Sequence, residues 1–221
     1  LRRALNRRSE WLAMGLALGS DESAIAGHVV AALREELQAG APGESLAAFF
    51  AGEWALDFQA YLGFLEMSEL KSDQAAATGL RAAFLLADTA LRFEELRAVF
   101  LTRENTLRAR KPGKTLDQRF TPAGAERFLE LHGRLGGRLM ACLEAQTAER
   151  ILAFNQDACD VFQAFLAHVA DFKKARRQID FVDAEWNVLK LLRDEASAAF
   201  LQARLDARYS HVLLDEFQDT N

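Results

Sequence analysis

The last residues of the chain carry the pattern with the clearest chemical meaning. The apolar run 212–214 is followed directly by Asp215 and Glu216. A strand that ends in this way delivers its carboxylates to the carboxyl edge of a sheet, where ligands bind in α/β proteins. There the first acid can hold Mg²⁺, usually through a water, and the second can polarise an attacking water. Acids also follow strands for purely structural reasons, so the pattern by itself leaves both interpretations open.

Two basic clusters are the next candidates, because Lys and Arg can bind DNA phosphates without sequence preference. The apolar-poor segment 102–121, interrupted by Pro112-Gly113, predicts an exposed loop whose cations can be removed with little effect on folding. The alternatives are a solvated loop and helix-end cations that face the helix dipole. The first cluster contains Arg103, Arg108, Arg110, Lys111, Lys114 and Arg119, and the second contains Lys173, Lys174, Arg176 and Arg177.

A phosphate-binding loop of the form G-x-x-x-x-G-K-[ST] is the obvious partner for Asp215 and Glu216. Only its end is matched, by Gly113-Lys114-Thr115, because Arg108 stands where the first glycine belongs. Pro112 also removes one of the backbone N–H groups that would cradle phosphate. We therefore expect no such loop in this chain, and no ATP hydrolysis by this chain alone.

The composition predicts a mainly α fold. Ala and Leu together make up about a third of the 221 residues, and both favour helices. Helices are expected over residues 1–18, 20–39, 45–50, 53–66 and 72–100, after Thr121-Pro122, and after the N-cap Asp180. The aromatic-rich region 49–65 is interpreted as core rather than as a base-stacking platform.

Two long helices, packed antiparallel, are the simplest way to bury two apolar stripes. A short strand at 212–214 would belong to a sheet whose other strands are absent from this chain. The first stripe consists of Phe128, Leu131, Leu135 and Leu139; the second consists of Ile151, Phe154, Ala158, Phe162, Phe165, Val169 and Phe172.

The overall charge and hydropathy limit the possible functions. The net charge is −5, so a nucleic-acid surface must be a local patch. No apolar run approaches the roughly 20 residues of a membrane span, so no membrane association is expected. The two cysteines and four histidines show no metal-ligand spacing, and the histidines are interpreted as structural or surface residues. The chain begins without Met and has no signal peptide, which suggests an internal piece of a longer cytoplasmic protein.

The string 213–221, Leu-Leu-Asp-Glu-Phe-Gln-Asp-Thr-Asn, resembles the Walker B motif (motif II) of superfamily 1 helicases of the UvrD/Rep class. The segments 173–183 and 205–211 also resemble that family, although Ala184 replaces its usual Leu. Residues 100–102, followed by a basic loop, resemble the larger AddA/RecB-type members, whose helical insertion before motif II is long.

This resemblance implies an ATP-dependent DNA helicase that uses ATP and Mg²⁺ as a full-length protein. Asp215 would lie at the Mg²⁺ site, Glu216 would be the catalytic base, and Gln218 and Asp219 would couple the nucleotide state to the DNA-binding motifs. Residues 1–208 would form the helical insertion domain called 1B, and residues 209–221 would begin the RecA-like core.

The resemblance also implies partners and a setting. The partners are duplex DNA near the fork, single-stranded DNA and a second subunit of a helicase–nuclease complex. The role is double-strand break repair and recombination at the bacterial nucleoid. The alternative is a non-enzymatic helical module that binds other proteins, in which the terminal acids are only structural.

Overall fold

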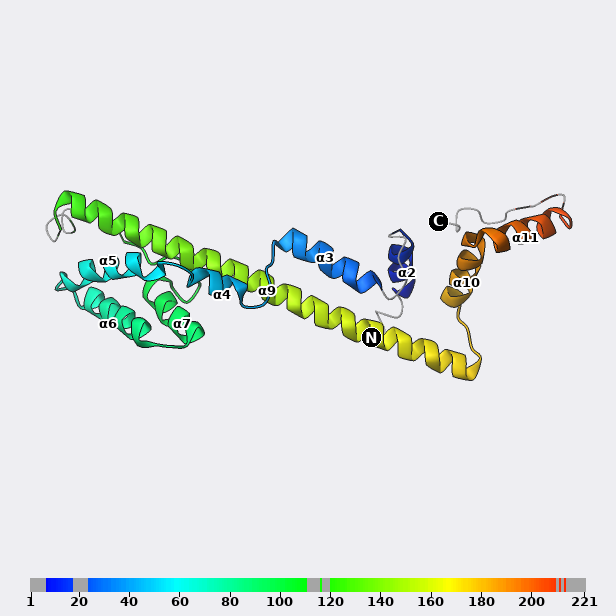
Figure 1. Cartoon of the computed structure of the whole chain (residues 1–221), viewed down its shortest axis with the longest axis horizontal. Helices are drawn as coiled ribbons and strands as arrows, with labels where there is room; N and C mark the ends of the chain where they lie inside the picture. The colour runs from blue at the N-terminus through cyan, green and yellow to red at the C-terminus, as the bar shows by residue number, and fades with distance from the viewer. Residues whose placement is uncertain are drawn as a thin grey trace. The chain divides into compact units, whose positions relative to one another are not determined.

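A computed structural model describes residues 7–17, 24–110, 116, 120–209, 211 and 213. This part of the chain contains nine helices and no strand, which confirms the mainly α prediction (Figure 1). The predicted strand at 212–214 lies outside the described residues except for Leu213. The helices are α2 (Arg8–Ala17), α3 (Ile25–Leu37), α4 (Glu44–Phe49), α5 (Trp54–Glu66), α6 (Lys71–Leu85), α7 (Thr89–Phe100), α9 (Pro122–Arg176), α10 (Phe181–Arg193) and α11 (Glu195–Asp206).

The chain divides into two compact units. One is Val29–Ala158, and the other combines Leu1–His28 with Cys159–Asn221. Helices α3 and α9 contribute residues to both units, whereas every other helix belongs to one of them. Among the described residues, no helix is both long enough and apolar enough to cross a membrane.

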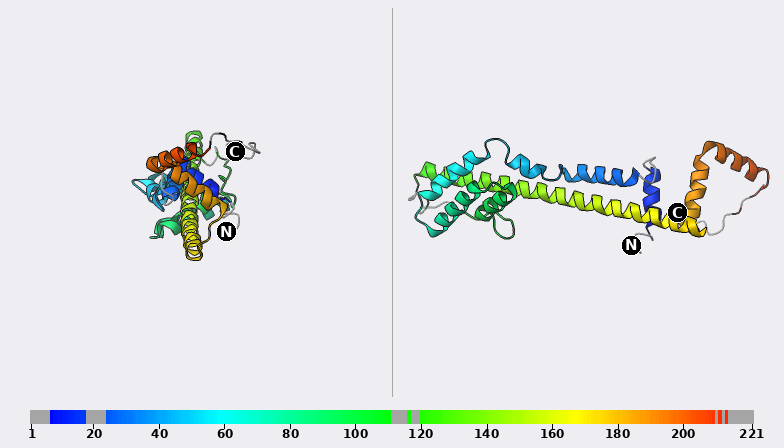
Figure 2. Two further views of the ribbon diagram at one scale, coloured as in Figure 1. Left: turned by 90° about the vertical axis from the view of Figure 1, so that its right-hand side faces the viewer. Right: turned by 60° about the horizontal axis from the view of Figure 1, so that its bottom comes forward.

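Aromatic side chains form the centre of the unit Val29–Ala158, where α5, α6 and α7 lie beside the first part of α9 (Figures 1 and 2). Tyr61 of α5 stacks on Phe128 of α9 with ring centroids 4.9 Å apart. Phe100 of α7 lies 5.0 Å from the Tyr61 ring. Within the aromatic region 49–65, Phe49, Phe58, Tyr61 and Leu65 are buried, so the interpretation of that region as core is correct for them. The same core holds Phe58, Leu65, Leu80, Phe93, Leu96, Leu131, Leu135 and Leu139.

Helix α9 corrects the prediction of two long antiparallel helices, because it is a single helix of 55 residues. At about 1.5 Å per residue it is roughly 80 Å long. It starts as predicted: Pro122 is its first residue, and the Thr121 hydroxyl accepts a hydrogen bond from the N–H of Gly124 at 3.2 Å. The first predicted stripe is buried, but the start of the second is not, since Ile151 is 41% and Phe154 72% exposed.

A second correction concerns residues 72–100, which form two helices rather than one. Helix α6 ends at Leu85, and Asp88 starts α7 as an N-cap whose side chain accepts from the N–H of Leu91 at 2.9 Å. The guanidinium of Arg92 donates to the carbonyl of Leu86, which satisfies one of the groups exposed at the break. The break lets α6 and α7 pack against each other as a helical hairpin.

The second unit has a smaller core. Trp11 of α2 packs edge-on against Phe162 of α9 at 5.1 Å, and Leu12 and Leu166 are buried. Helix α10 begins with the predicted N-cap Asp180, and α11 follows after Asp194 caps it in turn. Neither α10 nor α11 contains a buried residue, although both carry large apolar side chains.

Candidate nucleic-acid interface

The described part of the basic segment, residues 102–110, is a loop as predicted and is exposed at 103–106, 108 and 109, but Thr102, Leu107 and Arg110 are half-buried and anchor it to the core. Leu101 is buried and forms an antiparallel bridge with Leu107. The N–H of Thr102 donates to the carbonyl of Thr106 at 2.8 Å, and the N–H of Arg108 donates to the carbonyl of Phe100 at 2.8 Å. These bonds hold the segment in a tight hairpin-like turn at the end of α7.

Arg110 is committed to an ion pair with a buried acid. Its guanidinium lies 2.5 Å from Asp73 of α6, and the Asp73 side chain is only 2% exposed while that of Arg110 is 23% exposed. The other Asp73 oxygen accepts from the Ser68 hydroxyl at 2.5 Å, and the guanidinium also lies 5.7 Å from the centre of the Phe128 ring. Arg110 is therefore part of the packing of this unit, and the premise that it is an exposed loop cation is wrong.

Arg103 and Arg108, by contrast, are exposed. One guanidinium nitrogen of Arg108 donates to the carbonyl of Ala98 at 3.2 Å, which leaves its other donors toward solvent. No acid in the described ranges forms an ion pair with either arginine. The structure therefore leaves these two available for phosphate, whereas Lys111, Lys114 and Arg119 lie outside the described residues.

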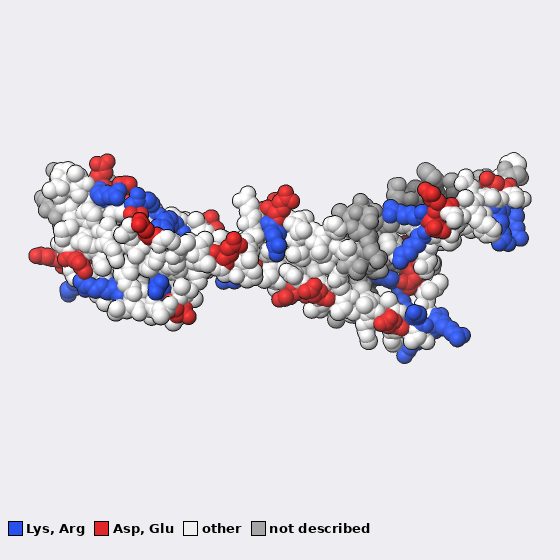
Figure 3. All heavy atoms as spheres, viewed as in Figure 1, with Lys and Arg blue, Asp and Glu red and all other residues white. Residues whose placement is uncertain are grey.

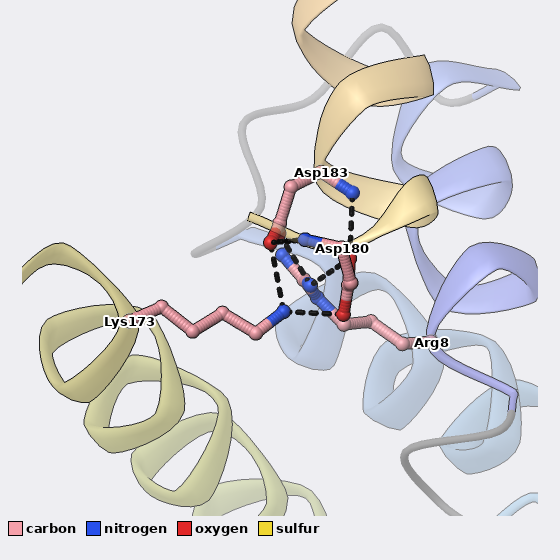
Figure 4. Close-up of polar contacts among 4 residues, drawn as sticks. All are labelled: Arg8, Lys173, Asp180 and Asp183. Atoms are coloured by element: carbon pink, nitrogen blue, oxygen red, sulfur yellow. Dashed lines mark hydrogen bonds and ion pairs between the residues drawn. The ribbon is translucent and has the colours of Figure 1, made fainter. Parts of the chain in front are cut away.

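The second basic cluster also contains a cation that is held in ion pairs with carboxylates. Lys173 near the end of α9 contacts both Asp180 and Asp183, the latter at 2.7 Å, and Arg8 of α2 lies 2.6 Å from Asp183 (Figure 4). Asp180 and Asp183 form a capping box at the start of α10. The four side chains thus join the ends of three helices, and Lys173 is a structural cation.

The charges in this cluster shift its pKa values in opposite directions. Burial opposes ionisation of Asp183, but hydrogen bonds from Lys173, the Asp180 backbone and Arg8 outweigh it and hold the pKa of Asp183 well below its usual value. Burial likewise opposes the charge of Lys173, but its bonds to the two carboxylates outweigh burial and raise its pKa. Asp183 and Lys173 are therefore both charged at neutral pH.

Three cations of the second cluster remain exposed: Lys174, Arg176 and Arg177. The Arg176 guanidinium lies 4.2 Å from the centre of the Phe172 ring. Arg177, the residue after α9, has a left-handed conformation with φ 53°, and the N–H of Gln178 donates to the carbonyl of Lys173 at 2.9 Å. On the face shown in Figure 3, basic and acidic side chains are intermixed.

A buried polar chain lies beneath the basic segment, and no pattern in the sequence predicts it. The Tyr61 hydroxyl lies 2.9 Å from Nδ1 of His132, and Nε2 of His132 lies 2.7 Å from the carbonyl oxygen of Arg108. Burial raises the pKa of Tyr61 to about 12. Burial also lowers the pKa of His132, against the raising effect of its bond to the Arg108 backbone. Both side chains are therefore neutral at pH 7.

The acidic string that ends the chain lies outside the described residues, so the structure gives no geometry for Asp215, Glu216, Gln218 or Asp219. Within the described ranges, no group of three or more His, Cys, Asp or Glu side chains could hold a metal ion. The candidate nucleotide chemistry therefore depends on the sequence motif and on the comparison with known families.

The family described as UvrD/REP helicase N-terminal domain matches residues 67–221. This chain belongs to that family of superfamily 1 helicases. The match covers α6, α7, the basic segment, all of α9, α10, α11 and the acidic string. Searches of curated proteins and of solved structures found no match to the chain.

Proposed function

We propose that this chain is part of an ATP-dependent DNA helicase of the AddA/RecB type, acting in double-strand break repair and recombination. The observation that carries the proposal is the family match, because it includes both the basic segment and the acidic string of motif II. Residues 1–208 would be the helical 1B-like insertion, and residues 209–221 would begin the RecA-like core. The full-length protein would act in the bacterial cytoplasm, at the nucleoid, with a partner subunit.

Motif II would supply the chemistry of ATP hydrolysis. In this proposal Asp215 helps to hold Mg²⁺ through a water and Glu216 accepts a proton from the attacking water. Gln218 and Asp219 couple the nucleotide state to the DNA-binding motifs. The phosphate loop comes from another part of the protein, so the isolated chain would hydrolyse no ATP.

Glu216→Gln in the full-length helicase tests this assignment. Loss of a general base slows turnover by about 10²–10⁴-fold. We expect DNA-stimulated ATP hydrolysis to fall in that range, while binding of a fluorescent ATP analogue is retained. The matched control is Glu195→Gln in the first turn of α11, which should leave the rate unchanged. Normal hydrolysis by Glu216→Gln would contradict the assignment of Glu216 as the catalytic base, whereas no DNA-stimulated hydrolysis by the unaltered protein would favour the non-enzymatic helical module.

DNA contact is proposed for those cations of the two basic clusters that have no acidic partner in the described ranges, together with the undescribed members of the first cluster. Arg110 and Lys173 are left out of this set because buried or half-buried carboxylates hold them. Both lie within two residues of an exposed cation in the sequence, Arg108 and Lys174 respectively, which is why they share a cluster with them. The remaining set is Arg103, Arg108, Lys111, Lys114, Arg119, Lys174, Arg176 and Arg177.

A salt titration of duplex binding tests the contact. Removal of one phosphate contact lowers the slope of log K against log salt by about 0.9. We expect Arg103→Ala with Arg108→Ala to weaken binding equally for unrelated sequences, because phosphates carry no sequence information. Arg127→Ala on α9, whose guanidinium pairs with Glu130 at 2.7 Å, is a matched exposed control. Unchanged affinity and slope in the double variant would contradict the assignment of the basic segment to DNA.

A further inference from the structure

The backbone at Arg108 is held on both sides while its side chain is left exposed. Its N–H donates to the carbonyl of Phe100, and its own carbonyl lies 2.7 Å from Nε2 of His132. Two residues later, Arg110 is held by Asp73. Two contacts therefore anchor the segment to the helices: His132 of α9 bonds to residue 108, and Asp73 of α6 pairs with residue 110.

The hydrogen bonds fix the roles of the buried groups. A carbonyl oxygen can only accept, so Nε2 of His132 must carry the proton and donate to Arg108. Nδ1 of the neutral ring is then an acceptor, and it takes the proton of the Tyr61 hydroxyl. Hydrogen bonds thus run in one direction, from the Tyr61 hydroxyl to His132 and from His132 to the Arg108 carbonyl, and each of these buried polar atoms has a partner.

This arrangement exceeds what packing of the unit requires. The His132 ring is 4% exposed and stacks near Phe100 and Tyr61, at 5.5 and 5.7 Å between ring centroids. An apolar ring in its place would keep those stacking contacts without the cost of burying polar atoms. What the imidazole adds is a directed bond to the backbone of the basic segment, at the residue whose side chain is exposed.

We propose that Tyr61 and His132 are positioning residues that fix Arg108 for contact with a phosphate of duplex DNA. The inference rests on the proposed DNA contact of the basic segment. A backbone that is already ordered loses less conformational freedom when the side chain binds, so a preorganised cation binds more tightly than one on a mobile loop. His132 touches no DNA in this proposal and acts only through Arg108.

The experiment measures duplex binding by the full-length helicase at low salt with a double-mutant cycle. His132→Phe keeps the ring and removes both hydrogen bonds, and Arg108→Ala removes the proposed contact. Arg108→Ala should weaken binding about tenfold, as expected for one charge-assisted contact. His132→Phe should weaken it by about threefold or more, and the double variant should bind no more weakly than Arg108→Ala, because the two act through one contact.

Two further variants separate positioning from loss of stability. Leu96→Ala removes a fully buried side chain of α7 and should lower the melting temperature while leaving duplex affinity unchanged. His132→Gln restores a donor to the Arg108 carbonyl and should recover part of the affinity. If His132→Phe does not fold, Tyr61→Phe removes a single hydroxyl and should give a smaller loss in the same direction. Hydrogen exchange at the Arg108 amide should speed up in His132→Phe and not in Leu96→Ala.

Each outcome decides the inference. Weaker binding in His132→Phe that disappears in the Arg108→Ala background supports it. Full affinity in His132→Phe, or a loss matched by Leu96→Ala, overturns it while the DNA contact of Arg108 stands. Unchanged affinity in Arg108→Ala overturns both the contact and the inference, and Glu216→Gln then tests the helicase assignment separately.

Discussion

Arg108 and Arg110 lie two residues apart in one basic segment, and the structure predicts opposite consequences for their removal. The Asp73 carboxylate beside Arg110 is 2% exposed, and the two charged groups are 2.5 Å apart. Removing one partner of a buried ion pair costs about 3–5 kcal/mol. Because Arg110 is partly exposed and Ser68 still donates to Asp73, we expect Arg110→Ala to cost about 3 kcal/mol, the lower limit. Arg108→Ala, a surface change, should stay within about 0.5 kcal/mol.

Thermal unfolding followed by circular dichroism measures this difference. For a chain of this size 1 kcal/mol corresponds to roughly 2–4 °C, so Arg110→Ala should melt about 6–12 °C below the wild type. Arg108→Ala should melt within about 2 °C of it. Replacing both members of the pair, Arg110→Ala with Asp73→Ala, should recover stability, because no buried charge is then left without its counter-ion.

The DNA measurement supplies the second half of the prediction. Arg108→Ala should weaken duplex binding at a temperature where both variants are folded, and Arg110→Ala should weaken it only to the extent that the segment loses its position. Equal melting temperatures for Arg110→Ala and the wild type would refute the reasoning, because they would show that the buried ion pair contributes nothing to the fold.

Two further predictions concern carboxylates. Glu149 of α9 accepts from the N–H groups of Gly43 and Ser45 at 2.9 and 2.8 Å, so Glu149→Ala should cost about 1–2 kcal/mol, as for loss of a helix cap. Burial opposes ionisation of Glu149, but these N–H groups outweigh burial and lower its pKa. The contribution of Glu149 to stability is therefore complete above about pH 5 and is lost as the pH falls. Thermal melts followed by circular dichroism at decreasing pH should show a smaller loss of stability in Glu149→Ala than in the wild type. Lys173→Met should lower the free energy of unfolding by about 1–2 kcal/mol, between the values for a surface and a buried ion pair, and urea unfolding measures the change. An unchanged urea midpoint would show that the ion pair with Asp183 does not stabilise the fold.

The local signals of helix starts are readable from the sequence. Thr121-Pro122 and Asp180 both begin helices as predicted, since a side-chain oxygen or a proline at that place satisfies or removes an unpaired N–H group. Asp88 is a signal of the same kind, and it breaks the single helix predicted over 72–100. Cap residues act through neighbours three positions away, so a single sequence contains the whole interaction.

The length of α9 is not readable in the same way. The change of apolar stripe between Leu139 and Ile151 suggests a turn, yet no proline or glycine lies between them to end a helix. Leu139 and Ile151 both belong to the unit Val29–Ala158, but Leu139 is buried whereas Ile151 and Phe154 are 41% and 72% exposed, so the helix continues beyond its buried stretch without a turn. Periodicity reports which face is buried, and only a terminating residue reports where a helix stops.

The candidate interface shows the limit of sequence reasoning most clearly, because charge is visible in a sequence and its partner is not. Asp73 lies 37 residues before Arg110, and His132 lies 24 residues after Arg108. Only the packing of α6 and α9 around one segment decides that the first arginine of the pair faces solvent while the second faces a carboxylate. A basic cluster in an acidic chain is therefore a mixture of structural and binding cations, and burial of the opposing acid separates the two.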